Sequence, residues 1–83
     1  MSNYNDANEI AYRAVYGRHY QGDEPCDRPA GITEKDGVLH GVLRLGDLLV
    51  GIKDVEIDLT GKPVCHETWA ELAMQIECIL AGY

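Results

Sequence analysis

The spacing of hydrophobic positions along the chain is helical at both ends and alternating in between. Over residues 6–16, small and apolar residues recur three and four positions apart, at Ala7, Ile10, Ala11, Ala14 and Val15. Asp6 followed three positions later by Glu9 has the form of a capping box, and Gly17 suits a left-handed helix end. The pattern therefore predicts an amphipathic helix over about residues 6–16.

The middle of the chain reads as a loop followed by short strands. Residues 20–30 combine proline, glycine and acidic residues, which is typical of a loop. Over residues 31–59, apolar runs are separated by turn sequences, of which Asp36-Gly37 favours a tight hairpin because both residues tolerate positive φ. The runs predict three or four antiparallel strands, and the unalternating residues 48–52 are expected as a strand covered on both faces.

Helical spacing returns over residues 65–81, where one face carries Trp69, Leu72, Ala73, Ile76, Ile79 and Leu80. The order of helix, strands and helix predicts a single α+β domain over residues 1–83, with both helices packed on the antiparallel sheet. A chain of this size buries only about 60% of its unfolded surface, so we expect one small core and no deep pocket beside it.

Tyrosines recur at every fourth position from the first helix into the loop, at Tyr12, Tyr16 and Tyr20. At about 100° per residue, Tyr12 and Tyr16 lie about 140° and 180° from the centre of the apolar face. We therefore expect both to point away from the core, whereas the direction of Tyr20, beyond Gly17, stays open. Tyrosine is enriched at protein interfaces, although exposed tyrosines without a role are also common.

The chain is acidic, with fourteen Asp and Glu against seven Lys and Arg and a net charge of −7. This charge opposes direct binding to nucleic acid or to an anionic membrane and favours a basic partner. Asp54, Glu56 and Asp58 alternate with apolar residues, so their carboxylates share one face of a strand at a spacing of about 7 Å. Such a row can match lysines and arginines on a partner, or it can protect an edge strand from aggregation.

The outward face of the second predicted helix carries Ala70, Met74, Cys78 and Ala81 among three glutamates. Small residues and a methionine can accept a helix from a partner or from a second copy of the chain. The alternative is that the alanines serve only as good helix formers.

The sequence offers few candidate residues for metal binding, cofactor binding or catalysis. The three cysteines and three histidines show no metal-ligand spacing and no phosphate or dinucleotide motif is present, so we expect neither a metal nor a cofactor. Cys65 is the one candidate nucleophile, because it begins the second helix, where the dipole lowers a thiol pKa, and His66 follows it. A structural cysteine at the start of a helix is the ordinary alternative.

These features predict a non-enzymatic protein that binds and occludes a basic, nucleic-acid-handling partner. We expect Tyr12, Tyr16 and Tyr20 to serve as anchors and the carboxylate row to complement the partner's charge. The chain lacks the start of a signal peptide and any apolar run of about 18 residues, so it is expected in the cytoplasm. The alternatives are a homodimer that binds a small ligand or nucleotide, and a small cysteine-dependent enzyme.

In its general profile, which is short, acidic and without a catalytic motif, the chain resembles small accessory proteins of phages and mobile elements. Inhibitors of host defence, including anti-CRISPR and antirestriction proteins, share this profile. The resemblance implies an anti-defence role, in which the protein acts by covering a surface of its target.

Overall fold

The computed structural model of the protein describes residues 3–22, 24–49, 51–52 and 55–82. Its elements follow in the order α1 (Asn3–Tyr16), β1 (Ile32–Lys35), β2 (Val38–Arg44), the 3-10 helix η1 (Leu45–Asp47), β3 (Glu56–Asp58) and α2 (His66–Ala81). The predicted α+β fold, with a helix, an antiparallel sheet and a second helix, is confirmed.

The three strands form one antiparallel sheet in the order β1-β2-β3, so β2 is central and β3 lies at an edge. Asp36 and Gly37 connect β1 to β2 with φ angles of 56° and 77°, which are the positive values expected of an Asp-Gly hairpin turn. The alternating pattern also holds in β3, where Ile57 is half-buried between the exposed Glu56 and Asp58.

The prediction of a further strand over residues 48–52 is wrong. β2 is followed by η1, and the amide groups of Leu48 and Leu49 both donate to the carbonyl oxygen of Leu45. Leu48 and Leu49 pack against the core and Ile52 is buried in it. Leu48, Leu49 and Ile52 are apolar because a loop, and not a strand, buries their side chains, which strand periodicity cannot reveal. Lys53-Asp54, another of the turn sequences that separate the predicted strands, lies outside the described residues.

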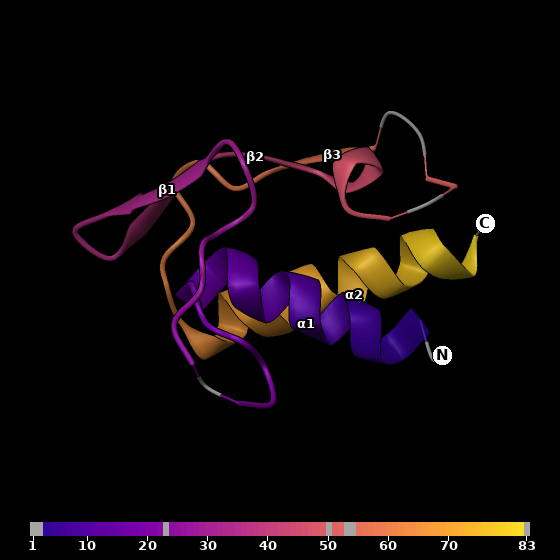
Figure 1. Ribbon diagram of the computed structural model, residues 1–83. Coiled ribbons are helices and arrows are strands. Elements are labelled where there is room, and N and C mark those ends of the chain that lie inside the picture. The colour runs from indigo at the N-terminus through magenta and orange to yellow at the C-terminus, as the bar shows by residue number, and fades with distance from the viewer. Residues whose placement is uncertain (1–2, 23, 50, 53–54, 83) are drawn as a thin grey trace.

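The two helices lie side by side and antiparallel on one side of the sheet (Figure 1). Gly17 ends α1 as predicted, with a φ of 68° and its amide donating to the carbonyl oxygen of Arg13 at 2.9 Å. The predicted start of α1 is wrong, because the helix begins at Asn3 and Asp6 lies inside its first turn. An acidic residue there still stabilises the helix through the dipole. Among the described residues, neither helix has the length and hydropathy that crossing a lipid bilayer requires.

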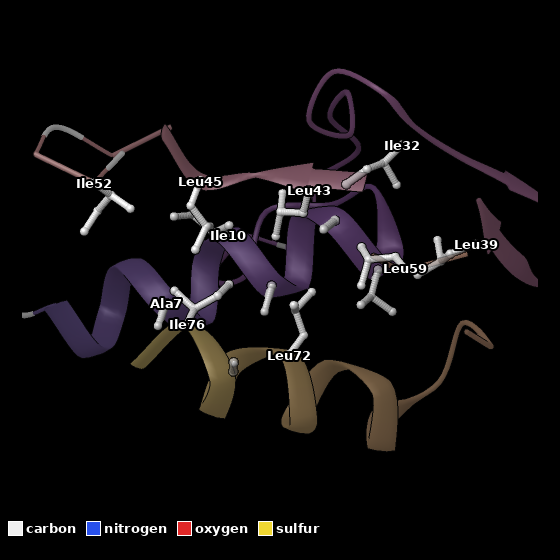
Figure 2. Close-up of a cluster of buried hydrophobic side chains, with 14 residues drawn as sticks. Ala7, Ile10, Ile32, Leu39, Leu43, Leu45, Ile52, Leu59, Leu72 and Ile76 are labelled. Atoms are coloured by element: carbon white, nitrogen blue, oxygen red, sulfur yellow. The ribbon is translucent and has the colours of Figure 1, made fainter. Parts of the chain in front are cut away.

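The core lies between the sheet and the helices, and α1 is covered on two sides (Figure 2). Ile10 lies beneath Leu45 of η1, whereas Ala7 lies beside Ile76 of α2. Small side chains on α1 allow this close packing, and three of its alanines are fully buried: Ala7, Ala11 and Ala14. Because neighbours cover α1 from two directions, its buried sector is wider than one apolar stripe.

Candidate protein-binding surface

Three of the tyrosines and the single tryptophan form an aromatic cluster at the junction of α1 and α2. The ring centroid of Tyr12 lies 4.7 Å from that of Tyr16, 5.7 Å from that of Tyr20 and 5.3 Å from that of Trp69. Tyr20 and Trp69 are 5.4 Å apart, which closes the cluster. All four side chains are half-buried, so the cluster is packed and still reaches the surface.

The prediction that Tyr12 and Tyr16 point away from the core is wrong for Tyr16, whereas Tyr12 is half-buried by its contact with α2. Tyr16 packs against the core, and Tyr12 lies against Trp69. The helical angles are as expected, but α2 covers the flank of α1 from which Tyr12 projects. The indole Nε1 of Trp69 also donates to the carbonyl oxygen of Asn8 at 3.3 Å, which joins the helices at this flank. The pattern of α1 alone contains no signal of where α2 lies.

Tyr20 joins the cluster because the loop after α1 folds back along the helix. Glu9 holds this loop: its Oε1 lies 3.0 Å from His19 Nδ1, and its Oε2 accepts the Tyr20 amide at 2.8 Å. Burial raises the pKa of Glu9, but the hydrogen bonds from His19 and the Tyr20 amide outweigh it, so the pKa lies below its ordinary value. Glu9 therefore positions Tyr20, a role that the sequence did not predict.

Two arginines fasten the rest of the loop to α1. Arg28 donates from Nε to the carbonyl oxygen of Ala14 at 3.2 Å and from Nη2 to that of Val15 at 3.0 Å. Arg13 donates from Nε to the carbonyl oxygen of Asp27 at 2.7 Å. The Arg28 guanidinium thus satisfies carbonyl groups at the end of α1 and lies at the negative end of the helix dipole.

A shallow groove borders the aromatic cluster along α2. We call it the Met74 groove, and its lining residues are Asn8 from α1 and His66, Trp69, Ala70, Ala73, Met74 and Glu77 from α2. Met74 is 63% exposed, unusual for a side chain of its size and hydrophobicity. All members of the predicted stripe are exposed, and two of them, Ala70 and Met74, line the groove. Trp69 belongs to both features, so the predicted tyrosine and α2 surfaces are continuous.

The carboxylate row lies on another side of the molecule. Glu56 and Asp58 project from the face of β3 opposite Ile57, which packs toward the core. Arg44 on β2 pairs with Glu56 at 3.3 Å. The Thr60 amide donates to the Asp58 carboxylate at 2.9 Å, and this hydrogen bond lowers the pKa of Asp58. Asp54 lies outside the described residues. A flat partner surface therefore cannot touch both the row and the aromatic cluster.

Cys65 and His66, the residues considered for nucleophilic chemistry, contact different neighbours. The Sγ of Cys65 lies 3.4 Å from the Thr68 hydroxyl oxygen, and this hydrogen bond is the main reason that the pKa of the thiol is lowered. The His66 ring meets Trp69 edge to face, with centroids 5.2 Å apart. In the part of the chain that the structure describes, no group of three or more His, Cys, Asp or Glu side chains could hold a metal ion.

Comparison with models of known protein families, with curated proteins and with solved structures found no match for this chain.

Proposed function

We propose that this chain is a non-enzymatic binding protein that occludes a basic, nucleic-acid-handling partner through the aromatic cluster and the Met74 groove. The observation that carries the proposal is the half-buried aromatic cluster, which is held between two helices and continues into the exposed Met74. Tyrosine and tryptophan dominate binding energy at many interfaces, because they bury a large area and have few rotatable bonds.

The charges beside the cluster support a basic partner. α2 contains Glu67, Glu71 and Glu77 and no Lys or Arg, and the whole chain has a net charge of −7. A second copy presenting the same acidic helix would be repelled, which weighs against dimerisation through α2. Glu56 and Asp58, on the other side, contribute through the long-range field, which raises the association rate without direct contact.

Occlusion of a nucleic-acid-handling protein would be sufficient for an anti-defence role of the kind that small acidic phage proteins perform. The acidic surface competes for a positively charged site on the target, and the aromatic cluster supplies the slow dissociation. No catalytic step is needed for such an effect.

The test begins with capture of the partner by the tagged chain in its native cells, followed by purification of the captured protein and measurement of both rate constants. Tyr20→Ala and Met74→Glu are the informative variants, since Tyr20 lies in a loop and Met74 is exposed. Each should weaken the affinity at least about tenfold, mainly through faster dissociation. The control is His40→Ala, an exposed residue of β2 on the sheet face away from the helices.

Thermal unfolding of each variant separates lost contact from lost structure. Unchanged affinity in both Tyr20→Ala and Met74→Glu would show that the partner binds elsewhere and would refute the proposal. A loss of affinity in His40→Ala equal to theirs would lead to the same conclusion.

A further inference from the structure

Three kinds of group line the Met74 groove. Its walls carry the aromatic rings of Trp69 and His66, the thioether of Met74 and the carboxylate of Glu77. Ala70 and Ala73 add only small methyl groups to the lining. The groove thus combines aromatic and apolar side chains with one carboxylate.

Glu77 is the unusual member of this set. It is half-buried, although a carboxylate prefers full hydration. Within the described part of the chain, the ion pairs join Glu9 to His19, Glu56 to Arg44 and Glu71 to Lys62, and none includes Glu77. A partly dehydrated carboxylate without a cation, beside aromatic rings, is suited to receive a positive group from outside.

An arginine side chain matches every wall of the groove. Its planar guanidinium stacks on aromatic rings and donates two parallel hydrogen bonds to a carboxylate, and its methylene stem packs on apolar surface. Phosphate groups are disfavoured by the acidic surroundings, because α2 carries three glutamates and, in the part of the chain that the structure describes, only Glu71 has a Lys or Arg partner. An ammonium group would gain the charge interaction but not the stacking of a planar cation.

We infer that the Met74 groove receives an arginine side chain from an apolar segment of the partner, with the guanidinium between Trp69 and the Glu77 carboxylate. This inference rests on the proposed function, because it names the chemistry by which the same surface recognises a basic protein. The flanking tyrosines contact the apolar residues of that segment, and the arginine fixes its register.

The probe for the test is the blocked hexapeptide acetyl-Leu-Arg-Leu-Leu-Arg-Leu-amide. Its matched control replaces both arginines with citrulline, which keeps the planar shape and removes the charge. Trp69 is the single tryptophan, so its fluorescence reports directly on the groove. We expect the arginine peptide to shift the Trp69 emission and to bind at least about tenfold more tightly than the citrulline peptide.

The protein variants are Glu77→Gln and its control Glu56→Gln, which makes the same change in charge on the outer face of β3. Glu77→Gln should weaken binding of the arginine peptide about tenfold, and Glu56→Gln by less than about twofold. Equal binding of the two peptides to the unmodified protein would overturn the inference, and that comparison needs no variant. Equal effects of the two substitutions would also overturn it.

Three further outcomes decide against the inference. Equal affinity for a peptide in which lysine replaces arginine would show that the groove recognises only charge. A dimer in analytical ultracentrifugation that Met74→Glu dissociates would show that a second copy occupies the groove. If Glu77→Gln leaves partner binding intact while Tyr20→Ala abolishes it, the inference fails and the proposed function stands; if neither weakens it, both fail.

Discussion

Tyr12 of α1 and Trp69 of α2 meet edge to face, with their ring centroids 5.3 Å apart and their planes inclined by 85°. This contact connects the first helix to the last and places the single tryptophan next to Tyr12 and Tyr20. The aromatic cluster is therefore a structural joint as well as a candidate binding surface. Substitutions in it affect stability and binding together, and the two effects must be measured separately.

A double-mutant cycle between Tyr12→Leu and Trp69→Leu measures the first of these effects. Edge-to-face aromatic pairs contribute about 0.5–1.5 kcal/mol beyond the area that they bury, so we expect a coupling energy of about 1 kcal/mol in the free energy of unfolding. Urea unfolding followed by far-UV circular dichroism is the measurement, because Trp69→Leu removes the fluorescent residue. The losses in the free energy of unfolding from Tyr12→Leu and His40→Ala should be additive. Additive losses in the Tyr12–Trp69 cycle would show that the contact between these two rings does not stabilise the packing of the helices.

Glu9→Gln should make the stability of the protein less dependent on pH in the acid range. The pKa of Glu9 is lowered in the folded protein, so its carboxylate stabilises the fold fully above the unfolded-state pKa of about 4.3. Below that pH the unfolded chain takes up the proton first, and the contribution is lost as the pH falls through the lowered folded-state pKa. Glu9 is 39% exposed, so solvent screening limits the effect to below about 1 kcal/mol.

The measurement for Glu9→Gln is the free energy of unfolding at intervals from pH 7 to pH 2.5. The difference from the unmodified protein should be constant near neutrality and should vanish at the acid end. Glu24→Gln, in the same loop and exposed, should stay within about 0.5 kcal/mol of the unmodified protein. A difference for Glu9→Gln that persists at pH 2.5 would mean that its carboxylate charge is not what holds Tyr20.

The sequence correctly predicted the turns and helix ends that depend on a few neighbouring residues. Asp36-Gly37 forms the hairpin turn, Gly17 ends α1 with positive φ, and α2 begins directly after Cys65. Each of these features follows from the backbone preferences of a few neighbouring residues. The α+β order follows from the change in hydrophobic period, since a helix and a strand bury different sets of positions.

The sequence predictions failed where contacts between residues far apart in the chain determine the structure. The burial of Tyr12 depends on Trp69, which comes from the other end of the chain. Glu9 holds Tyr20 only because the loop after α1 returns to the helix. Leu48, Leu49 and Ile52 matched a strand pattern because burial in a loop favours the same apolar residue types as burial in a strand. The meeting of the two predicted surfaces at Trp69 likewise depends on how the helices pack, which no local pattern encodes.

Gly41→Ala should be severely destabilising, with a loss of more than about 3 kcal/mol or no folding at all. Gly41 has a φ of 119°, and an added Cβ would collide with the backbone carbonyl of Gly31. A backbone carbonyl cannot rotate out of the way as a side chain can. Gly61→Ala is the matched control, because Gly61 also has positive φ, at 87°, but has open space around the added methyl group.

The Gly61→Ala variant should lose only about 1 kcal/mol, the cost of positive φ for alanine. Chemical denaturation of both variants, with the sheet monitored by circular dichroism, gives the comparison. Equal losses in the two variants would mean that the close approach of Gly31 to Gly41 is relaxed at little cost.

Arg28→Met should destabilise the end of α1 by about 1–2 kcal/mol, because it removes two hydrogen bonds to helix carbonyl groups and a cation from the negative end of the dipole. Arg28→Lys should be intermediate, since an ammonium group keeps the charge but cannot reproduce the fork of donors. The control is Arg44→Met, because the Arg44 side chain is 66% exposed and pairs with an exposed glutamate, so the loss of stability should stay below about 0.5 kcal/mol.

Amide hydrogen exchange should show faster opening of the last turn of α1 in Arg28→Met and not in Arg44→Met. Because the same loop carries Tyr20, Trp69 fluorescence should also respond to Arg28→Met, and an unchanged spectrum would show that Tyr20 keeps its position without Arg28.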